Sequence, residues 1–233
     1  MRLTRLKMYF LQRTFRFHII MFFLLWTVYE IFISPYIKGQ NTIVFNFFNP
    51  TIKLFIWTLP VFIILQMKGK EAFSYLKLNN DFRNSIRFSV IAGIFIISYN
   101  LLTEYLFFGK FSINPFFDID KWVNGVILVG FTEEILFRGY FLQQIGCYFT
   151  FWTANFITSV LFLLIHFPIW YVHATTIVSG YGEWVGLITF IFGFSMAQGY
   201  LFKKSNSLWP CILMHAINNF MVNAFVIVGN FPS

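Results

Sequence analysis

The sequence predicts an all-α polytopic membrane protein, a bundle of about seven transmembrane helices. Of its 233 residues, 58% are hydrophobic and only 11% are charged, whereas a soluble domain usually carries about 25% charged residues. A water-soluble core of this size could not bury 35 Phe side chains. The apolar residues also gather into runs close to the roughly 20 helical residues that cross the hydrocarbon of a bilayer.

Seven apolar segments follow one another along the chain: residues 17–33, 52–67, 88–108, 122–147, 151–172, 185–202 and 208–228. The second segment is short and carries Pro60 in its middle, so a start near Ile43 with a break at Pro50 is an open alternative. The first segment is followed by Ser34 and Pro35 and not by a small-residue cleavage site. We therefore expect an uncleaved first helix and not a signal peptide.

The basic residues predict how the bundle is oriented. Twelve of the 17 Lys and Arg fall on one side of a seven-span topology: Arg2, Arg5, Lys7, Arg13, Arg16, Lys68, Lys70, Lys77, Arg83, Arg87, Lys203 and Lys204. The other side receives Lys38, Lys53, Lys110 and Lys121. The positive-inside rule then predicts a cytoplasmic N-terminus. Because the net charge of +8 sits in short segments between apolar runs, it predicts membrane topology and no nucleic-acid partner.

The chain is expected to form a single membrane domain, in which residues 1–121 contribute helices without a recognisable motif and residues 122–228 form the core that carries the motifs. Cys147 and Cys211 form no CxxC spacing, so each is expected to pack as a small apolar residue. Richness in Phe, Ile, Asn and Lys suits an AT-rich genome and predicts the cytoplasmic membrane of a bacterium. Membrane lipid is an implied partner, and the oligomeric state is left open.

Three fragments of this core place ionisable or strongly polar side chains inside apolar runs. They are EEILFR from Glu133 to Arg138, FLLIH from Phe162 to His166, and HAINN from His215 to Asn219. Such groups are expensive in a bilayer and need a partner or a function. Carboxylates, imidazoles, a guanidinium and an amide together are the groups that a hydrolytic site uses, which predicts an active site inside the bundle.

The spacing within the first fragment predicts different tasks for its two acids. Glu134 and Arg138 are four residues apart and share a helix face, so they can pair. Glu133 points about 100° away from that face and has no adjacent cation, which suits a general base. The alternative is that both acids neutralise Arg138 and only hold helices together.

The third fragment again has a four-residue spacing, which puts His215 and Asn219 on one face. Two donors aimed at one point are what a developing oxyanion requires, and each is typically worth about 10²–10³ in rate. The alternative is interhelical hydrogen bonding, worth around 1 kcal/mol. His166 and His215 are expected to differ in depth, and either tilt of the helices or breaks near Pro168 and Pro210 would close that gap.

Other polar residues in the spans are expected to lie outside the site. Glu30 and Glu104 fall near the outer ends of their predicted segments, where reaching the interface or local hydrogen bonding is the expected role. His18 and His173 fall at segment boundaries and are expected to be structural.

Written as EExxxR, FxxxH and HxxxN, the three fragments resemble the CPBP family of intramembrane proteases. That family includes CAAX-processing endopeptidases, which act on prenylated proteins, and bacterial relatives linked to bacteriocin processing and self-immunity. Gly139 follows Arg138 as in the family, and the run Ser207-Leu208-Trp209-Pro210 before His215 resembles the family's approach to its third motif. The resemblance covers about residues 122–223.

This resemblance implies an endopeptidase that cuts a membrane-associated peptide or protein. It makes Glu133 the group that activates water, assisted by His166, with His215 and Asn219 steadying the tetrahedral intermediate and Glu134 and Arg138 in support. The family is often called metalloprotease, and Glu133, His166 and His215 are also a possible ligand set for a catalytic zinc. Zinc and metal-free general-base chemistry both stay open.

Two other functions are compatible with the same residues. A non-catalytic immunity protein would bind a partner without hydrolysis. A proton-coupled transporter would use buried Glu and His as a relay, although no inverted repeat relates the two halves of the chain.

Overall fold

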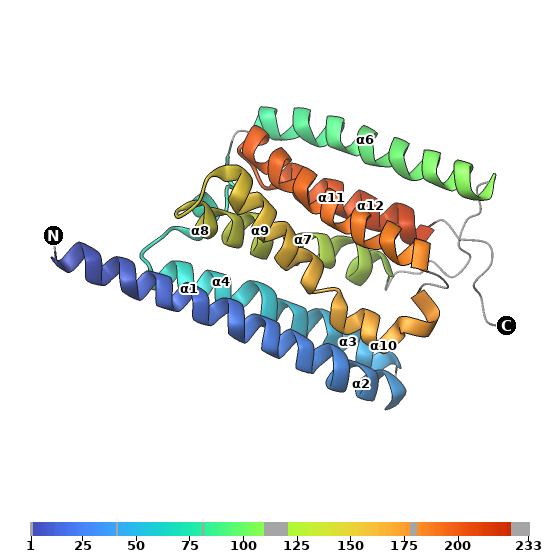
Figure 1. Cartoon of the computed structure of the whole chain (residues 1–233), viewed down its shortest axis with the longest axis horizontal. Helices are drawn as coiled ribbons and strands as arrows, with labels where there is room; N and C mark the ends of the chain where they lie inside the picture. The colour runs from blue at the N-terminus through green and yellow to red at the C-terminus, as the bar shows by residue number, and fades with distance from the viewer. Residues whose placement is uncertain (1, 41, 81, 110–120, 178–180, 225–233) are drawn as a thin grey trace.

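The computed structural model describes residues 2–40, 42–80, 82–109, 121–177 and 181–224, and over these residues it contains helices and short connections without a strand (Figure 1). The chain is therefore an all-α polytopic membrane protein, as its composition predicts. Several helices include π-helical stretches, which are labelled η. The N-terminal half contains α1 (Arg2–Val28), η1 (Tyr29–Ile33), α2 (Ser34–Gln40), α3 (Thr42–Lys53), η2 (Leu54–Thr58), α4 (Leu59–Met67), α5 (Ala72–Tyr75) and α6 (Phe82–Phe108).

The C-terminal half contains the helices that carry the three motifs. They are η3 (Lys121–Leu128), α7 (Val129–Glu134), η4 (Ile135–Leu142), α8 (Gln143–Gly146), α9 (Phe151–Leu164), α10 (Phe167–Ile177), α11 (Tyr181–Ser205) and α12 (Trp209–Ala224). The stretch from η3 to α8 is continuous in sequence, and so is the stretch from α1 to α2.

Five described segments are long and apolar enough to cross a membrane: Arg13–Gly39, Phe48–Met67, Phe82–Leu106, Phe151–Val172 and Tyr181–Ser205. The two other predicted segments, 122–147 and 208–228, are helical over nearly all of their described residues but are not among these five. The first of them carries three charged side chains, and the second is described only as far as Ala224. The count of seven spans stays a prediction.

The second segment starts where the alternative reading placed it, but Pro50 does not break it. Helical structure runs from Thr42 to Met67 with Pro50 inside α3. The π-helical stretch η2 comes directly before α4, and Pro60 lies in the first turn of α4. Because a wider turn redistributes backbone hydrogen bonds around a missing N–H, this π-helical stretch lets the helix continue past a proline.

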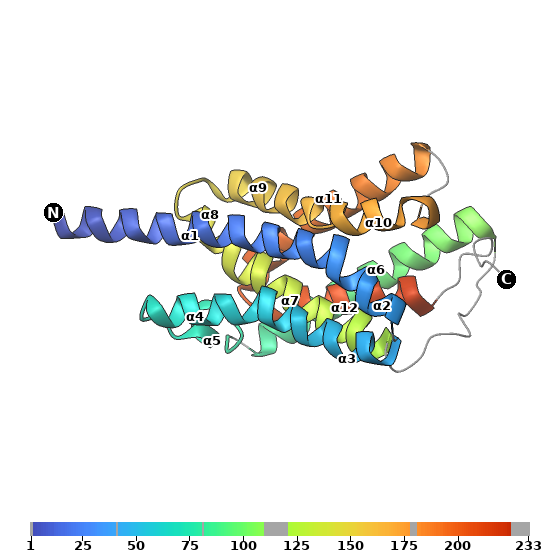
Figure 2. The ribbon, with the colours of Figure 1, turned by 90° about the horizontal axis from the view of Figure 1, so that it is seen from below.

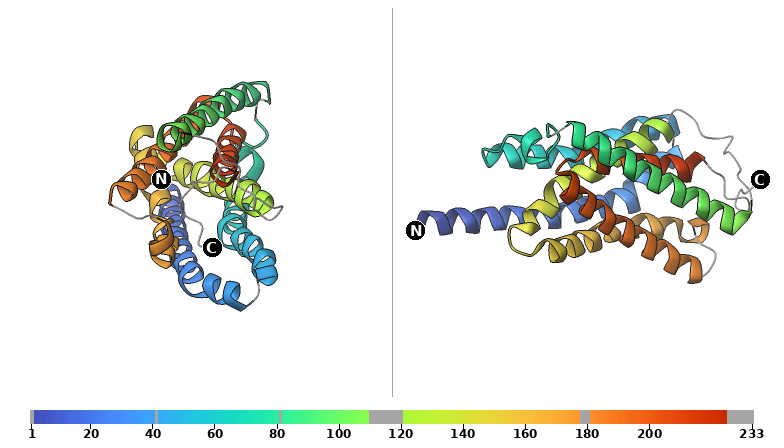
Figure 3. Two further views of the ribbon diagram at one scale, coloured as in Figure 1. Left: turned by 90° about the vertical axis from the view of Figure 1, so that its right-hand side faces the viewer. Right: turned by 90° about the horizontal axis from the view of Figure 1, so that it is seen from above.

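The motif-bearing helix from η3 to α8 lies at the centre of the bundle (Figures 1 and 2). All eight residues of η4 are buried, as expected for a helix that other helices surround on every side. α7 packs against α12 and η2, and η4 packs against α9 and α11. The view from the end shows α6 beside α12 on one side of the bundle and α1 and α3 on the other (Figure 3).

A close approach between α7 and α12 brings their polar residues together. A Cβ atom at Gly130 would lie 3.2 Å from the backbone nitrogen of Ala216 and 3.3 Å from the carbonyl oxygen of Ile212. These distances are tighter than ordinary van der Waals contact with backbone atoms that cannot easily move. The absent side chain at Gly130 therefore sets the spacing of the two helices one turn before Glu134.

The expected breaks at Pro168 and Pro210 are present. α9 ends at Leu164 and α10 begins at Phe167, so His166 lies in the junction just before Pro168. The carbonyl oxygen of Ile165 accepts a hydrogen bond of 3.0 Å from the indole nitrogen of Trp26, which satisfies a backbone group freed by the break. Pro210 occupies the second position of α12, where its missing N–H costs little.

Candidate active site

A single carboxylate oxygen joins two of the motifs. Oε1 of Glu134 accepts hydrogen bonds from Arg138 Nη1 and from His215 Nδ1, each at 2.8 Å. All three side chains are buried. The spacing within the first fragment predicts the pair of Glu134 and Arg138, and the structure has this pair. The bond to His215 on α12 is a tertiary contact, and it places the proton of the imidazole on Nδ1.

The guanidinium of Arg138 connects three helices. Its second nitrogen donates to the hydroxyl of Ser195 at 2.8 Å and to the carbonyl of Ser195 at 3.2 Å, both on α11. The guanidinium carbon lies 4.5 Å from the centre of the Phe162 ring on α9, a cation–π geometry. Arg138 is therefore fully engaged in holding the site together. Ser195 has no counterpart among the predicted residues.

The imidazole of His215 lies between two carboxylates. Its Nδ1 bonds to Glu134, and its Nε2 lies 3.9 Å from Oε2 of Glu133. That distance is too long for a direct hydrogen bond and is compatible with an intervening water. Oε2 of Glu133 is buried and has no hydrogen-bond partner among the described residues. An unpaired buried carboxylate oxygen is costly, and Oε2 of Glu134 is unpaired in the same way.

His166 lies at the junction of α9 and α10. Its Nδ1 is 2.9 Å from the carbonyl oxygen of Phe162, so Nδ1 carries the proton and Nε2 keeps its lone pair. Of the charged groups that act on this ring, Glu133 has the largest electrostatic effect. The Phe162 ring contacts both imidazoles, with centroids 5.3 Å from His166 and 6.0 Å from His215. The break in the helix thus closes the expected difference in depth.

Asn219 has a different partner from the one its spacing suggests. Its amide nitrogen donates to the carbonyl oxygen of Gly125 on η3 at 2.9 Å. In this arrangement the carboxamide supports η3 and is not directed with His215 toward one point. The oxyanion role of Asn219 stays a prediction.

Glu30 is a residue that the sequence interpretation placed outside the site and that the structure places inside the bundle. Its side chain is 7% exposed, and it interacts electrostatically with Lys53 and with Glu133. The expected position near a helix end was wrong because helical structure continues from α1 through η1 to Gln40. The apolar run ends at Ile33, which suggests a helix end close to Glu30. Because the helix continues to Gln40, Glu30 lies well inside it.

The predicted zinc ligands have suitable chemistry but not the spacing of a metal site. Glu133, His166 and His215 supply one carboxylate and two imidazoles whose Nδ1 atoms are held by other groups, as is usual for metal-bound histidines. Over the described residues, however, no three His, Cys, Asp or Glu side chains gather closely enough to hold a metal ion. No step proposed below passes through a metal.

Residues 115–221 match the family model described as type II CAAX prenyl endopeptidase Rce1-like. No curated protein and no solved structure matches the chain. The matched segment contains all three motifs, from Glu133 to Asn219. Over this segment the chain is similar to the Rce1-like CAAX endopeptidases, and this match confirms the resemblance to intramembrane proteases that the three motifs predict.

Proposed function

We propose that this protein is an intramembrane endopeptidase in which Glu133 and His166 activate a water molecule for attack on a peptide bond. The proposal rests mainly on one observation, the buried and unpartnered carboxylate oxygen of Glu133 facing Nε2 of His215 at 3.9 Å. The match of residues 115–221 to an endopeptidase family model supports the reaction class. The substrate is a membrane-associated peptide or protein, such as a bacteriocin precursor or another secreted peptide, in the cytoplasmic membrane of a bacterium.

The first step is proton removal from water. Glu133 accepts the proton, and the free lone pair on Nε2 of His166 accepts the second hydrogen bond of the same water and orients it. The oxygen attacks the carbonyl carbon of the peptide, and a tetrahedral intermediate with a negatively charged oxygen forms. When the C–N bond breaks, the proton held by Glu133 passes to the leaving amine.

The second task is to stabilise the oxyanion. Glu134 accepts from Nδ1 of His215 and so fixes the ring with Nε2 on the side of Glu133. An N–H at Nε2 is the proposed oxyanion donor, and a donor of this kind is worth about 10²–10³ in rate. Asn219 is the proposed second donor and would have to exchange its bond to Gly125 for one to the substrate.

The test compares membrane peptides from cells that carry no protein, the wild type, Glu133→Gln, His166→Gln or Glu71→Gln. Glu71 is an exposed acid that caps α5, so Glu71→Gln controls for the loss of a carboxylate away from the site. Loss of a general base lowers the rate by about 10²–10⁴. We expect a set of peptides that is present in cells with the wild type and absent from cells without the protein. The same peptides should be present with Glu71→Gln and absent with Glu133→Gln and with His166→Gln.

Membrane-extracted protein must be present at equal levels in all variants, as measured by immunoblot. Peptides that are unchanged by Glu133→Gln would contradict the proposed base. A wild type that releases no peptide, in cells that are nevertheless protected from a bacteriocin, would favour the non-catalytic immunity function.

A further inference from the structure

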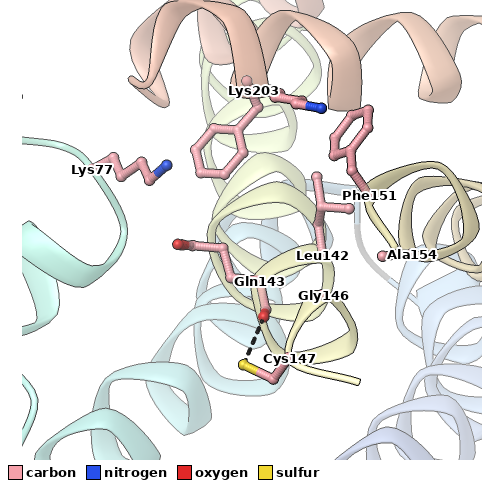
Figure 4. Close-up of a pocket in the computed structure, with 9 residues that line it drawn as sticks. Lys77, Leu142, Gln143, Gly146, Cys147, Phe151, Ala154 and Lys203 are labelled. Carbon is pink, nitrogen blue, oxygen red and sulfur yellow. Dashed lines mark hydrogen bonds between the residues drawn. The ribbon is translucent and has the colours of Figure 1, made fainter. Parts of the chain in front are cut away.

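A pocket lies away from Glu133, where α9 begins and α11 ends. It has a volume of about 340 Å³ and is lined by Lys77, Leu142, Gln143, Gly146, Cys147, Phe151, Ala154, Phe202 and Lys203. Figure 4 shows Lys77 and Lys203 reaching it from two different elements. Two cationic side chains therefore share one pocket, and its lining contains no carboxylate.

The two lysines are held in place by contacts that leave their charges uncompensated. Nζ of Lys77 donates to Oδ1 of Asn206 at 2.6 Å and lies 4.8 Å from the centre of the Phe202 ring. Nζ of Lys203 lies 4.2 Å from the centre of the Phe151 ring. These partners are neutral, and neither lysine forms an ion pair with a carboxylate among the described residues. Desolvation lowers the pKa of Lys77, as expected for a cation that lacks a counter-ion.

The backbone around Lys77 is also fixed. Its φ of 58° is in the left-handed region that a residue other than glycine seldom adopts. The carbonyl oxygen of Lys77 accepts from the backbone nitrogen of Leu208 at 3.1 Å, and the neighbouring carbonyl of Leu78 accepts from the indole of Trp209 at 2.8 Å. The loop is thus attached to the start of α12, and the position of the cation is built into the fold.

The location of the pocket indicates which kind of ligand it binds. It lies at the end of the bundle where α11 ends and α6 begins, because Ser85 on α6 bonds to Ser207 in the connection after α11. The sequence places Lys68, Lys70, Arg83, Arg87 and Lys204 at this same, predicted cytoplasmic end. Anionic lipids are concentrated at that membrane surface, and basic pockets between transmembrane helices bind their head groups.

We propose that this pocket binds the phosphate group of an anionic phospholipid between Lys77 and Lys203. The phosphate accepts charge-assisted hydrogen bonds from both ammonium groups. The apolar part of the lining, Leu142, Phe151 and Ala154, contacts the glycerol and the start of the acyl chains. That apolar surface favours a lipid over free inorganic phosphate. The site is independent of the proposed protease activity.

Cys147 provides a direct readout of occupancy. Its thiol is exposed and lines the pocket, whereas Cys211, the second of the two cysteines in the chain, is buried. The experiment measures how fast N-ethylmaleimide labels Cys147 in the purified full chain. The protein is reconstituted in phosphatidylcholine vesicles that contain increasing fractions of phosphatidylglycerol. A parallel series contains phosphatidylcholine alone with added inorganic phosphate.

We expect labelling to slow as the phosphatidylglycerol fraction rises. Each lysine near an anionic lipid surface contributes about fivefold to affinity. The midpoint of protection should therefore shift about fivefold in Lys77→Gln or Lys203→Gln and about 25-fold in the double variant. Lys204→Gln is the matched control, because it removes the adjacent charge of the same helical turn, which lies over Tyr200 and outside the pocket.

A negatively charged surface by itself also slows thiol labelling, and this effect is the same for every variant. Equal slowing in the wild type and the Lys77→Gln/Lys203→Gln variant would therefore overturn the proposal, and so would an equal shift in Lys204→Gln. Full protection by inorganic phosphate, with none from phosphatidylglycerol, would assign the pocket to a soluble anion instead of a lipid.

Discussion

Glu134 and His215 form a hydrogen bond of 2.8 Å although they are 81 residues apart in the sequence. The oxygen of Glu134 that accepts from His215 also accepts from Arg138. One buried atom therefore couples the first and third motifs. In the proposed mechanism Glu134 is a positioning residue that acts through His215.

Removal of Glu134 alone should destabilise the protein. Glu134→Ala leaves the buried guanidinium of Arg138 without its counter-ion, and breaking a buried pair in this way typically costs about 3–5 kcal/mol. The measurement is the unfolding free energy of the purified protein in detergent. Replacing both partners, as in Glu134→Leu/Arg138→Met, should recover much of that loss, because no uncompensated charge is left. A double variant that is less stable than Glu134→Ala would contradict the structural pairing.

Glu30 should contribute to turnover from outside the three motifs. Its carboxylate interacts with Glu133 from the first helix, and its negative charge favours the uptake of a proton by Glu133 in the proposed first step. We expect Glu30→Gln to lower kcat/KM about tenfold, which corresponds to about 1.4 kcal/mol. Lys53→Gln is the matched control, since it removes a nearby charge of opposite sign and should not lower kcat/KM. Equal losses in both variants would indicate a structural effect in place of an electrostatic one.

The spacing of α7 and α12 should tolerate no side chain at Gly130. In Gly130→Val the new atoms meet the backbone of Ala216 and Ile212, and such overpacking typically costs about 1–3 kcal/mol. Separation of the helices also lengthens the bond between Glu134 and His215, so activity should fall together with thermal stability. A Cβ atom at Gly125 meets nothing within 4 Å, so Gly125→Ala should be folded and active.

The proposed mechanism predicts that activity survives metal removal. Glu133, His166 and His215 do not gather closely enough to hold a metal ion in this structure, and the proposed steps use only side chains and water. Purified protein treated exhaustively with a chelator should keep its peptidase activity and contain no stoichiometric metal by elemental analysis. Activity that is lost on chelation and restored by zinc alone would support the metalloprotease alternative.

The sequence is sufficient to predict the fold class and the residues of the three motifs. Hydrophobic runs identify the helices, because each span must be long and apolar, and the four-residue spacing predicts the pair of Glu134 and Arg138. The breaks near Pro168 and Pro210 are also predictable, because proline lacks the N–H that continues a helix.

Tertiary packing determines the contacts and the burial that the sequence does not predict. The carbonyl of Gly125 that binds Asn219 becomes accessible through the placement of η3 beside α12, which no local pattern encodes. Ser195 is one of many small polar residues in the chain, and only the approach of Arg138 distinguishes it. The burial of Glu30 depends on where the first helix ends, and polar residues such as Ser34 and Lys38 hide that point in the sequence.

The end of α9 at Leu164 also has an electrostatic consequence. The peptide dipoles of a helix sum to a partial negative charge at its C-terminal end, which favours a nearby cation by about 0.3–1 kcal/mol, and more where the site is partly buried. His166 follows that end by two residues, so a proton on its ring would lie in the favourable field of α9. If α9 continued without a break, its C-terminal end and the associated field would lie at the membrane surface, far from the imidazole of His166.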